Sequence, residues 1–97
     1  MKIQIRDNEY EVKSNVRAMM VYEGITDKPF QISNLTDFYT YCFAMLYANN
    51  SENVPEFDEF LDWFDGEEGE ELVKKFGEAM NTKKPLESKK KPQKTKE

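Results

Sequence analysis

Three carboxylates at helical spacing are the first side chains of this sequence that could do chemistry. Asp58, Asp62 and Asp65 would project from one side of a helix, close enough to hold a calcium ion weakly. However, the segment lacks the alternating oxygen ligands and the glycine of a calcium-binding loop. Because a solvated helix face explains the same acids, we expect no metal site here.

The other reactive residue types argue against an enzyme. The sequence contains no histidine, which removes the commonest general base and metal ligand at neutral pH. Cys42 is the only cysteine and lies in the most apolar stretch, where burial raises the pKa of a thiol and leaves it inert. None of the glycines belongs to a phosphate-binding pattern. We therefore predict a protein that is not an enzyme and uses no cofactor.

Charge divides the chain into an acidic body and a basic end. Residues 1–82 carry a net charge of -10, whereas residues 83–97 include seven lysines and carry +5. Because an acidic body repels phosphates, we expect it to bind no nucleic acid. The basic end has almost no apolar side chain to bury, which predicts a single small domain over residues 1–82 and a disordered lysine-rich tail over 83–97.

The single cysteine and the hydropathy of the sequence predict the cellular compartment in which the protein acts. A lone cysteine excludes an intramolecular disulfide and favours a reducing cytosol. The N-terminus MKIQIRD contains no apolar run of signal-peptide length, and the longest apolar stretch is shorter than the ~20 residues of a membrane helix. We expect no contact with a membrane and no export by a signal peptide.

The first residues alternate apolar and polar side chains in two runs, 2–6 and 9–13, which predicts a β-hairpin. Asp7 and Asn8 would form its two-residue turn. The side chains facing the helices would be Ile3, Ile5, Tyr10 and Val12.

A first helix should begin at a cap supplied by Ser14 or Asn15 and run to about Glu23, where Gly24 supplies a stop. Its apolar side would consist of Val16, Met19 and Met20.

The segment FYTYCFAMLYA at residues 38–48 is the most apolar of the chain and predicts a helix from about Leu35 to Asn49, capped by Ser33 or Asn34. One apolar stripe would contain Leu35, Phe38, Tyr39, Cys42, Met45 and Leu46.

Two further amphipathic helices should follow. The third begins near Pro55 and ends at Gly66, and the last runs from about Glu67 or Glu70 to Asn81. Their inward side chains would be Phe57, Phe60, Leu61 and Phe64, and then Leu72, Phe76 and Met80. The predicted fold class is α+β and mostly α, with an N-terminal β-hairpin and about four helices.

The second helix is apolar on more than one face. Phe43 and Tyr47 extend its stripe on one side, and Tyr41 lies beyond the other edge. A domain this small buries a limited share of its surface, so a second subunit or a bound segment is the favoured cover, and the alternative is a central helix wrapped by its own neighbours. Trp63 lies off the third helix's stripe, and the methionines offer adaptable apolar surface. The predicted partner-binding residues are Tyr41, Phe43, Tyr47, Trp63, Met19 and Met20.

Two segments carry a resemblance to a known family. The pattern NVRAMMVYEGITDKPF at residues 15–30 follows a KIQIRDNEYEVK hairpin and precedes an aromatic-rich helix and FDEFLDWFD at residues 57–65. This layout resembles the tail assembly chaperones of long-tailed bacteriophages. The resemblance covers about residues 1–65, and no catalytic motif or family binding residue anchors it.

The resemblance implies a small, mostly helical, acidic protein that acts in the cytoplasm of the infected bacterium and is absent from the mature virion. Its partner would be the tape measure protein, kept soluble until tail tube protein polymerises around it. Such chaperones commonly have a longer form made by ribosomal frameshifting, for which Lys83-Lys84 and Lys89-Lys90-Lys91 are candidate slip sites. The implied protein is an interaction protein, and the apolar second helix predicts a homo-oligomer.

Two alternative functions belong to other classes. An acidic mimic of DNA that inhibits a nuclease or restriction enzyme is compatible with the charge of the body and with the acids between Glu52 and Glu71. A structural component of the phage head or tail is the other alternative. The apolar character of the second helix favours the chaperone over the mimic, because mimicry depends on exposed acids.

Removal of residues 83–97 should leave the melting temperature nearly unchanged, because this segment has almost nothing apolar to bury. The measurement is thermal unfolding of the full chain and of a chain ending at Thr82. A loss of several degrees on truncation would mean that the lysines dock on the acidic body.

Overall fold

The computed structural model describes residues 1–81, in which two strands precede four helices. The elements are β1 (Lys2–Ile5), β2 (Asn8–Glu11), α1 (Val16–Thr26), α2 (Leu35–Asn49), α3 (Phe57–Asp65) and α4 (Gly69–Asn81). This order confirms the predicted fold class, a mostly helical chain that opens with a β-hairpin. The predicted tail at residues 83–97 lies outside the described residues.

The hairpin forms where the alternation predicts it, but its turn is one residue earlier. β1 and β2 pair antiparallel with Ile5 opposite Asn8, so the turn residues are Arg6 and Asp7 rather than Asp7 and Asn8. Arg6 takes the left-handed conformation, with φ of 55°. Both registers keep the same side chains on one face, so the alternation alone could not distinguish them. The predicted inward residues Ile3, Ile5, Tyr10 and Val12 are all buried.

Helix α1 continues past the glycine that was expected to end it. The side chain of Asn15 caps its first turn by accepting a hydrogen bond from the backbone N–H of Ala18 at 2.9 Å. The helix includes Gly24 and ends at Thr26; the capping residue Asp27 takes the left-handed conformation with φ of 60° and donates its N–H to the carbonyl of Glu23. A glycine ends a helix by adopting positive φ, and here the aspartate does so.

The buried face of α1 also differs from the prediction. Ala18 and Tyr22 face the core, whereas Val16 and Met20 are 70% and 66% exposed and Met19 is half-buried. Small Ala18 allows close packing on α2, and the Tyr22 hydroxyl finds polar partners in Gln31 of the crossover and Asp37 of α2. An apolar pattern could not reveal a core face made of an alanine and a tyrosine.

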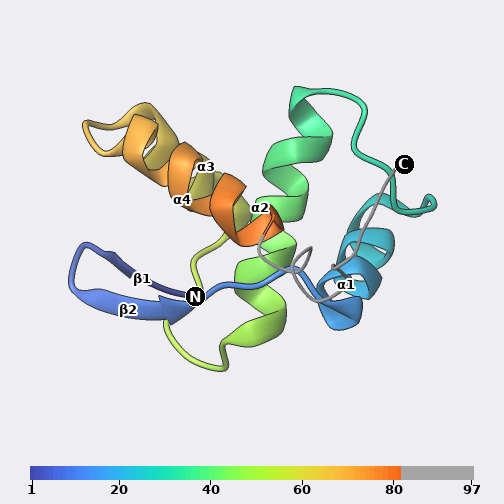
Figure 1. The fold of residues 1–97 in the computed structure, drawn as a ribbon, viewed down its shortest axis with the longest axis horizontal. Helices are drawn as coiled ribbons and strands as arrows, with labels where there is room; N and C mark the ends of the chain where they lie inside the picture. The colour runs from blue at the N-terminus through green and yellow to red at the C-terminus, as the bar shows by residue number, and fades with distance from the viewer. Residues whose placement is uncertain (82–97) are drawn as a thin grey trace, which may run out of the picture.

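Helix α2 is the centre of the molecule and begins and ends at the predicted residues. All seven residues from Thr40 to Leu46 are buried. Figure 1 shows α1 on one side of α2, and the α3–α4 pair with the hairpin on the other. For residues 40–46 the structure therefore has the alternative, a central helix wrapped by its own neighbours, whereas the flank residue Tyr47 is 56% exposed.

Two asparagines at the end of α2 attach it to the N-terminal elements. The side-chain amide of Asn50 accepts from the backbone N–H of Glu11 at 2.9 Å and donates to the Glu11 carbonyl at 2.8 Å, as a neighbouring strand would. Asn49 donates to the carbonyl of Lys13 at 3.1 Å and accepts from the Asn15 side chain at 3.0 Å. These bonds place the start of α1 beside the end of α2, so the two helices run antiparallel.

Helices α3 and α4 pack against each other through aromatic rings and a close backbone contact. The ring of Phe60 lies 5.7 Å from that of Phe76 and 5.1 Å from that of Phe64, in edge-to-face geometry. Gly69 begins α4 directly against the backbone carbonyl of Phe64. A side chain at Gly69 has no room, so this glycine sets how closely the two helices approach.

Two glycines of α4 give a matched test of this contact. Gly69→Ala should destabilise the fold by about 2 kcal/mol or more, because a Cβ would collide with the carbonyl of Phe64. Gly77→Ala should instead stabilise it by roughly 0.5–1 kcal/mol, since a Cβ there meets nothing within 4 Å and alanine favours the helix. Urea unfolding measures both, and equal effects would contradict the packing described.

Candidate functional site

The six predicted partner-binding residues occupy very different environments. Tyr41, Phe43 and Trp63 are buried, with 1%, 8% and 6% of their surface exposed. Met19 is half-buried, and Met20 and Tyr47 are exposed. The set is thus not one surface, and half of it belongs to the core.

Tyr41 holds the crossover and the start of α1 against α2. Its ring centroid lies 4.6 Å from that of Phe30, and its hydroxyl shares a 2.6 Å hydrogen bond with the hydroxyl of Ser14. Burial raises the pKa of the Tyr41 hydroxyl above its usual value. The prediction that Tyr41 contacts a partner was wrong, because the crossover that follows α1 folds back over it. A substitution at Tyr41 would therefore test folding rather than association.

Phe43 and Trp63 join α2, α3 and the hairpin. The Phe43 ring lies 5.3 Å from the rings of both Phe57 and Phe60. Trp63 lies 5.9 Å from Tyr10 of the hairpin and 5.8 Å from Phe60. Their assignment as partner contacts was also wrong. Trp63 falls off the stripe of α3 because that helix packs on the hairpin as well as on α2 and α4, and the tryptophan faces the hairpin.

Met20 and Tyr47 stay available to a partner, but on different surfaces. Met20 lies on α1 in a shallow hollow with Val16 and Arg17. Tyr47 lies near the end of α2, 56% exposed, in a hollow with Asn50 and the loop that precedes α3. These two hollows have no lining residue in common.

A groove between the first turn of α2 and helix α3 has a mainly apolar lining. It has a volume of about 200 Å³ and is lined by Leu35, Thr36, Tyr39, Phe57 and Leu61. Leu35 is 69% exposed at its mouth, and the other apolar members are half-buried. We call this the α2–α3 groove.

The spacing of apolar residues placed the four apolar groove residues in the core stripes of the second and third helices. Leu35 was expected to be buried, yet it is the first residue of α2 and has neighbours on one side only. A stripe that continues to the first turn of a helix can extend beyond the elements that cover it. The place of Leu35 in the first turn was therefore the sequence signal that it could be exposed. The separation of α2 from α3 cannot be inferred from the spacing of apolar residues.

Acidic side chains border the α2–α3 groove along α3. Asp58, Asp62 and Asp65 are exposed and stand three residues before, one after and four after Leu61. Residues three and four apart are neighbours on a helix surface, so two of these carboxylates flank Leu61. Because α3 contains no lysine or arginine, this side of the groove is negative. The groove therefore suits an apolar side chain carried next to basic ones.

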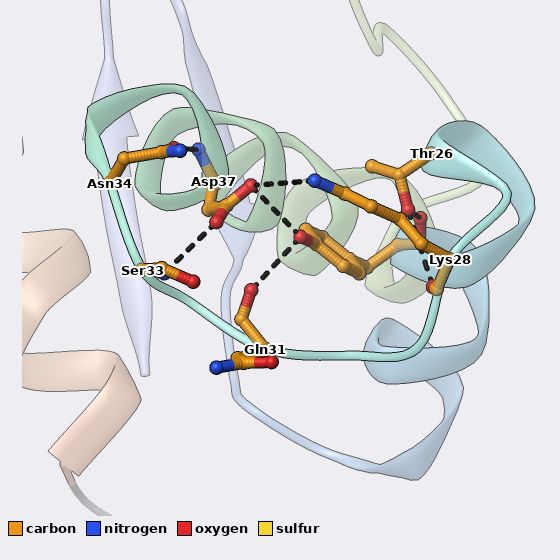
Figure 2. A network of polar contacts seen from close by, with 7 residues as sticks. Thr26, Lys28, Gln31, Ser33, Asn34 and Asp37 are labelled. Carbon is orange, nitrogen blue, oxygen red and sulfur yellow. Dashed lines mark hydrogen bonds and ion pairs between the residues drawn. The ribbon is translucent and has the colours of Figure 1, made fainter.

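A buried carboxylate fixes the end of α2 at which Leu35 stands. Figure 2 shows Asp37 meeting Ser33 and Lys28 from the crossover: its carboxylate accepts from the Ser33 N–H at 2.9 Å and from the Lys28 ammonium at 3.5 Å. The Tyr22 hydroxyl also donates to it, at 3.1 Å. The Asn34 side chain caps α2 by accepting from the Asp37 N–H at 2.9 Å.

These hydrogen bonds perturb the titration of two groups. The Ser33 N–H, and then Tyr22 and Lys28, hold the pKa of Asp37 below its usual value, against the opposite effect of burial. Burial, and then the Asp37 carboxylate, raise the pKa of Tyr22. Asp37 was not singled out by sequence reasoning, although an acid three residues after the cap Asn34 is the spacing of a capping box. Its role is to position the crossover.

The reactive residue types are not gathered into a site in the described part of the chain. Within residues 1–81 no three histidine, cysteine or acidic side chains are placed to hold a metal ion. Cys42 is fully buried, and burial raises the pKa of its thiol. In the same residues, no helix has the length and apolar character to cross a membrane.

The chain matches no family model, no curated protein and no solved structure.

The Asp37 network predicts a defined pH dependence of stability. Because the pKa of Asp37 is lower in the folded than in the unfolded chain, the ionised carboxylate stabilises the fold above its ordinary pKa of 3.8. This stabilisation is lost as the pH falls through the lowered folded pKa. Asp37→Asn should lower the melting temperature by several degrees at pH 7 and by much less at pH 3.

The matched control is Asp58→Asn on the exposed face of α3. Thermal unfolding of both variants between pH 3 and pH 7 is the measurement. If Asp37→Asn and Asp58→Asn shift the melting temperature equally at every pH, the network does not contribute as described.

Proposed function

We propose that this protein binds amphipathic helices and acts as a tail assembly chaperone, which keeps the tape measure protein of a long-tailed bacteriophage soluble during tail assembly. The proposal places it in the cytoplasm of the infected bacterium and outside the mature virion. It combines the resemblance of residues 15–30 and 57–65 to that family with the features of one surface.

The single observation that carries the proposal is the α2–α3 groove. It combines half-buried aromatic and aliphatic side chains with an exposed leucine at its mouth. Apolar grooves bordered by charge are a common way to receive one face of an amphipathic helix. A chaperone of this kind needs such a surface to cover apolar residues of its partner, which would otherwise aggregate.

Acidic charge would contribute to the proposed function in two ways, by attracting a basic helix and by keeping the complex dispersed. The carboxylates along α3 would meet basic side chains beside the apolar stripe of a bound helix. The net charge of -10 on residues 1–82 would also keep the chaperone and its cargo dispersed while apolar surface is exposed. Both effects predict binding that weakens at high salt.

The buried aromatic residues limit how a partner could bind. Since Tyr41, Phe43 and Trp63 maintain the core, binding need not involve opening α2. The groove is formed by two helices that the ring contacts of Phe57 and Phe43 hold together. A preformed groove of this kind loses little entropy on binding, which favours capture of a partner that is itself flexible.

Leu35→Glu should abolish the ability to keep the tape measure protein soluble, because it places a charge at the mouth of the groove. The experiment co-expresses each variant with the tape measure protein from the same genome and measures the soluble fraction and co-purification. Val73→Glu on α4 is the matched control, since Val73 is also exposed but lies outside the groove.

We expect a loss of at least ~10-fold in co-purified tape measure protein for Leu35→Glu and none for Val73→Glu. Equal behaviour of both variants would exclude the groove as the site. A wild-type protein that leaves the tape measure protein insoluble would contradict the chaperone function itself.

A further inference from the structure

The exposed side of α1 carries an arrangement of residues that the described fold does not use. Six exposed residues share it: Val16, Arg17, Met20, Glu23, Gly24 and Asp27. At 100° per residue they lie opposite the core-facing Ala18 and Tyr22, with Met20 near the middle. We call this the α1 outer face. Figure 1 shows α1 as an outer helix that packs on α2.

Charge on the α1 outer face opposes the helix dipole. Arg17 stands in the first turn, while Glu23 and Asp27 stand at the end, and α1 has no acid in its first turn and no base in its last. A helix prefers the reverse, with acids at its N-terminus and bases at its C-terminus. The isolated helix is therefore destabilised by its own charge order.

Gly24 adds a second local cost on the same face. A glycine within a helix is less favourable than alanine because it loses more backbone freedom on folding. A Cβ at Gly24 would meet nothing within 4 Å, so packing inside the described chain does not require a glycine. Gly24 also has no positive φ that would call for one. It leaves a shallow notch two turns along the face from Val16.

We propose that the α1 outer face binds the same face of a second copy of this chain, with the two α1 helices antiparallel about a two-fold axis at Met20. In this register Arg17 lies opposite Glu23 of the second copy, because both stand three residues from Met20. Val16 lies opposite the notch at Gly24 in the same way, since both stand four residues from Met20. Met20 meets its own copy at the centre.

The antiparallel pairing offsets both destabilising features of α1, its charge order and the glycine at position 24. Each arginine gains an acid and each helix dipole meets its opposite, whereas a parallel pair would bring like charges together. The notch admits Val16 and lets the helices approach. Glu23 retains a free carboxylate oxygen for this role, because its bond to the Phe30 N–H at 2.8 Å uses Oε2. Self-complementarity of this kind specifies a second copy rather than an unrelated partner.

The contact is small, so the dimer should be weak and reversible. Eleven helical residues span about 16 Å, which is short for a stable interface. This inference does not depend on the proposed function, because the α2–α3 groove lies on other helices and shares no residue with the α1 outer face.

Exchanging the charges of Arg17 and Glu23 tests this pairing. Self-association of the full chain is measured by analytical ultracentrifugation from about 10 µM to about 1 mM. Arg17→Glu and Glu23→Arg should each weaken self-association at least ~10-fold. An equimolar mixture of these two variants, and the double variant in one chain, should restore it. Arg17→Glu should not lower the melting temperature of the monomer, because an acid in the first turn favours the helix.

Gly24→Leu separates association from folding, since it should fill the notch and abolish dimers while raising the stability of the monomeric helix. Ile25→Glu is the matched control: Ile25 is 48% exposed on α1 but lies off the α1 outer face, so association should be unchanged. A wild-type protein that is monomeric throughout overturns the proposal and leaves the face to another occupant. Failure of the mixed charge variants to associate overturns it as well.

Discussion

Burial of the middle of α2 on all sides is the constraint on which the rest of this structure depends. Seven consecutive residues of one helix, from Thr40 to Leu46, are removed from solvent. Tyr41 and Phe43 stand about 200° apart on the helix, so one faces α1 and the crossover while the other faces α3. Burying each large apolar side chain contributes ~1.5–3 kcal/mol. Loss of the contact with α1, α3 or β2 would expose part of this helix.

The polar groups at the two ends of α2 decide how its neighbours attach. At the C-terminal end, the amides of Asn49 and Asn50 bind the backbone of the hairpin and of the segment that leads into α1. At the N-terminal end, Asp37 collects the Ser33 N–H, the Tyr22 hydroxyl and the Lys28 ammonium. A buried carboxylate left without these donors would be costly, which makes the conformation of the crossover specific.

The α2–α3 groove and the α1 outer face differ in chemistry. The α2–α3 groove is concave and apolar with an acidic border, which suits a basic amphipathic helix. The α1 outer face has charges of opposite sign at its two ends, which suits a copy of itself. A chaperone that uses both could coat a long helical partner, since each subunit would hold cargo through one surface and a neighbouring subunit through the other.

The sequence by itself determined the local structure of this protein. Alternation predicted the hairpin and its inward residues, and helical spacing with caps placed α2 from Leu35 to Asn49, because these signals act between residues close in the chain. Only the tertiary structure decided which apolar side chains are covered. Tyr41, Phe43 and Trp63 were expected at a partner surface and are core, while Leu35 and Val16 were expected inside and are exposed. Helical spacing gives the direction of a side chain but not what lies there, and that depends on how the crossover, the α3–α4 pair and the hairpin pack around α2.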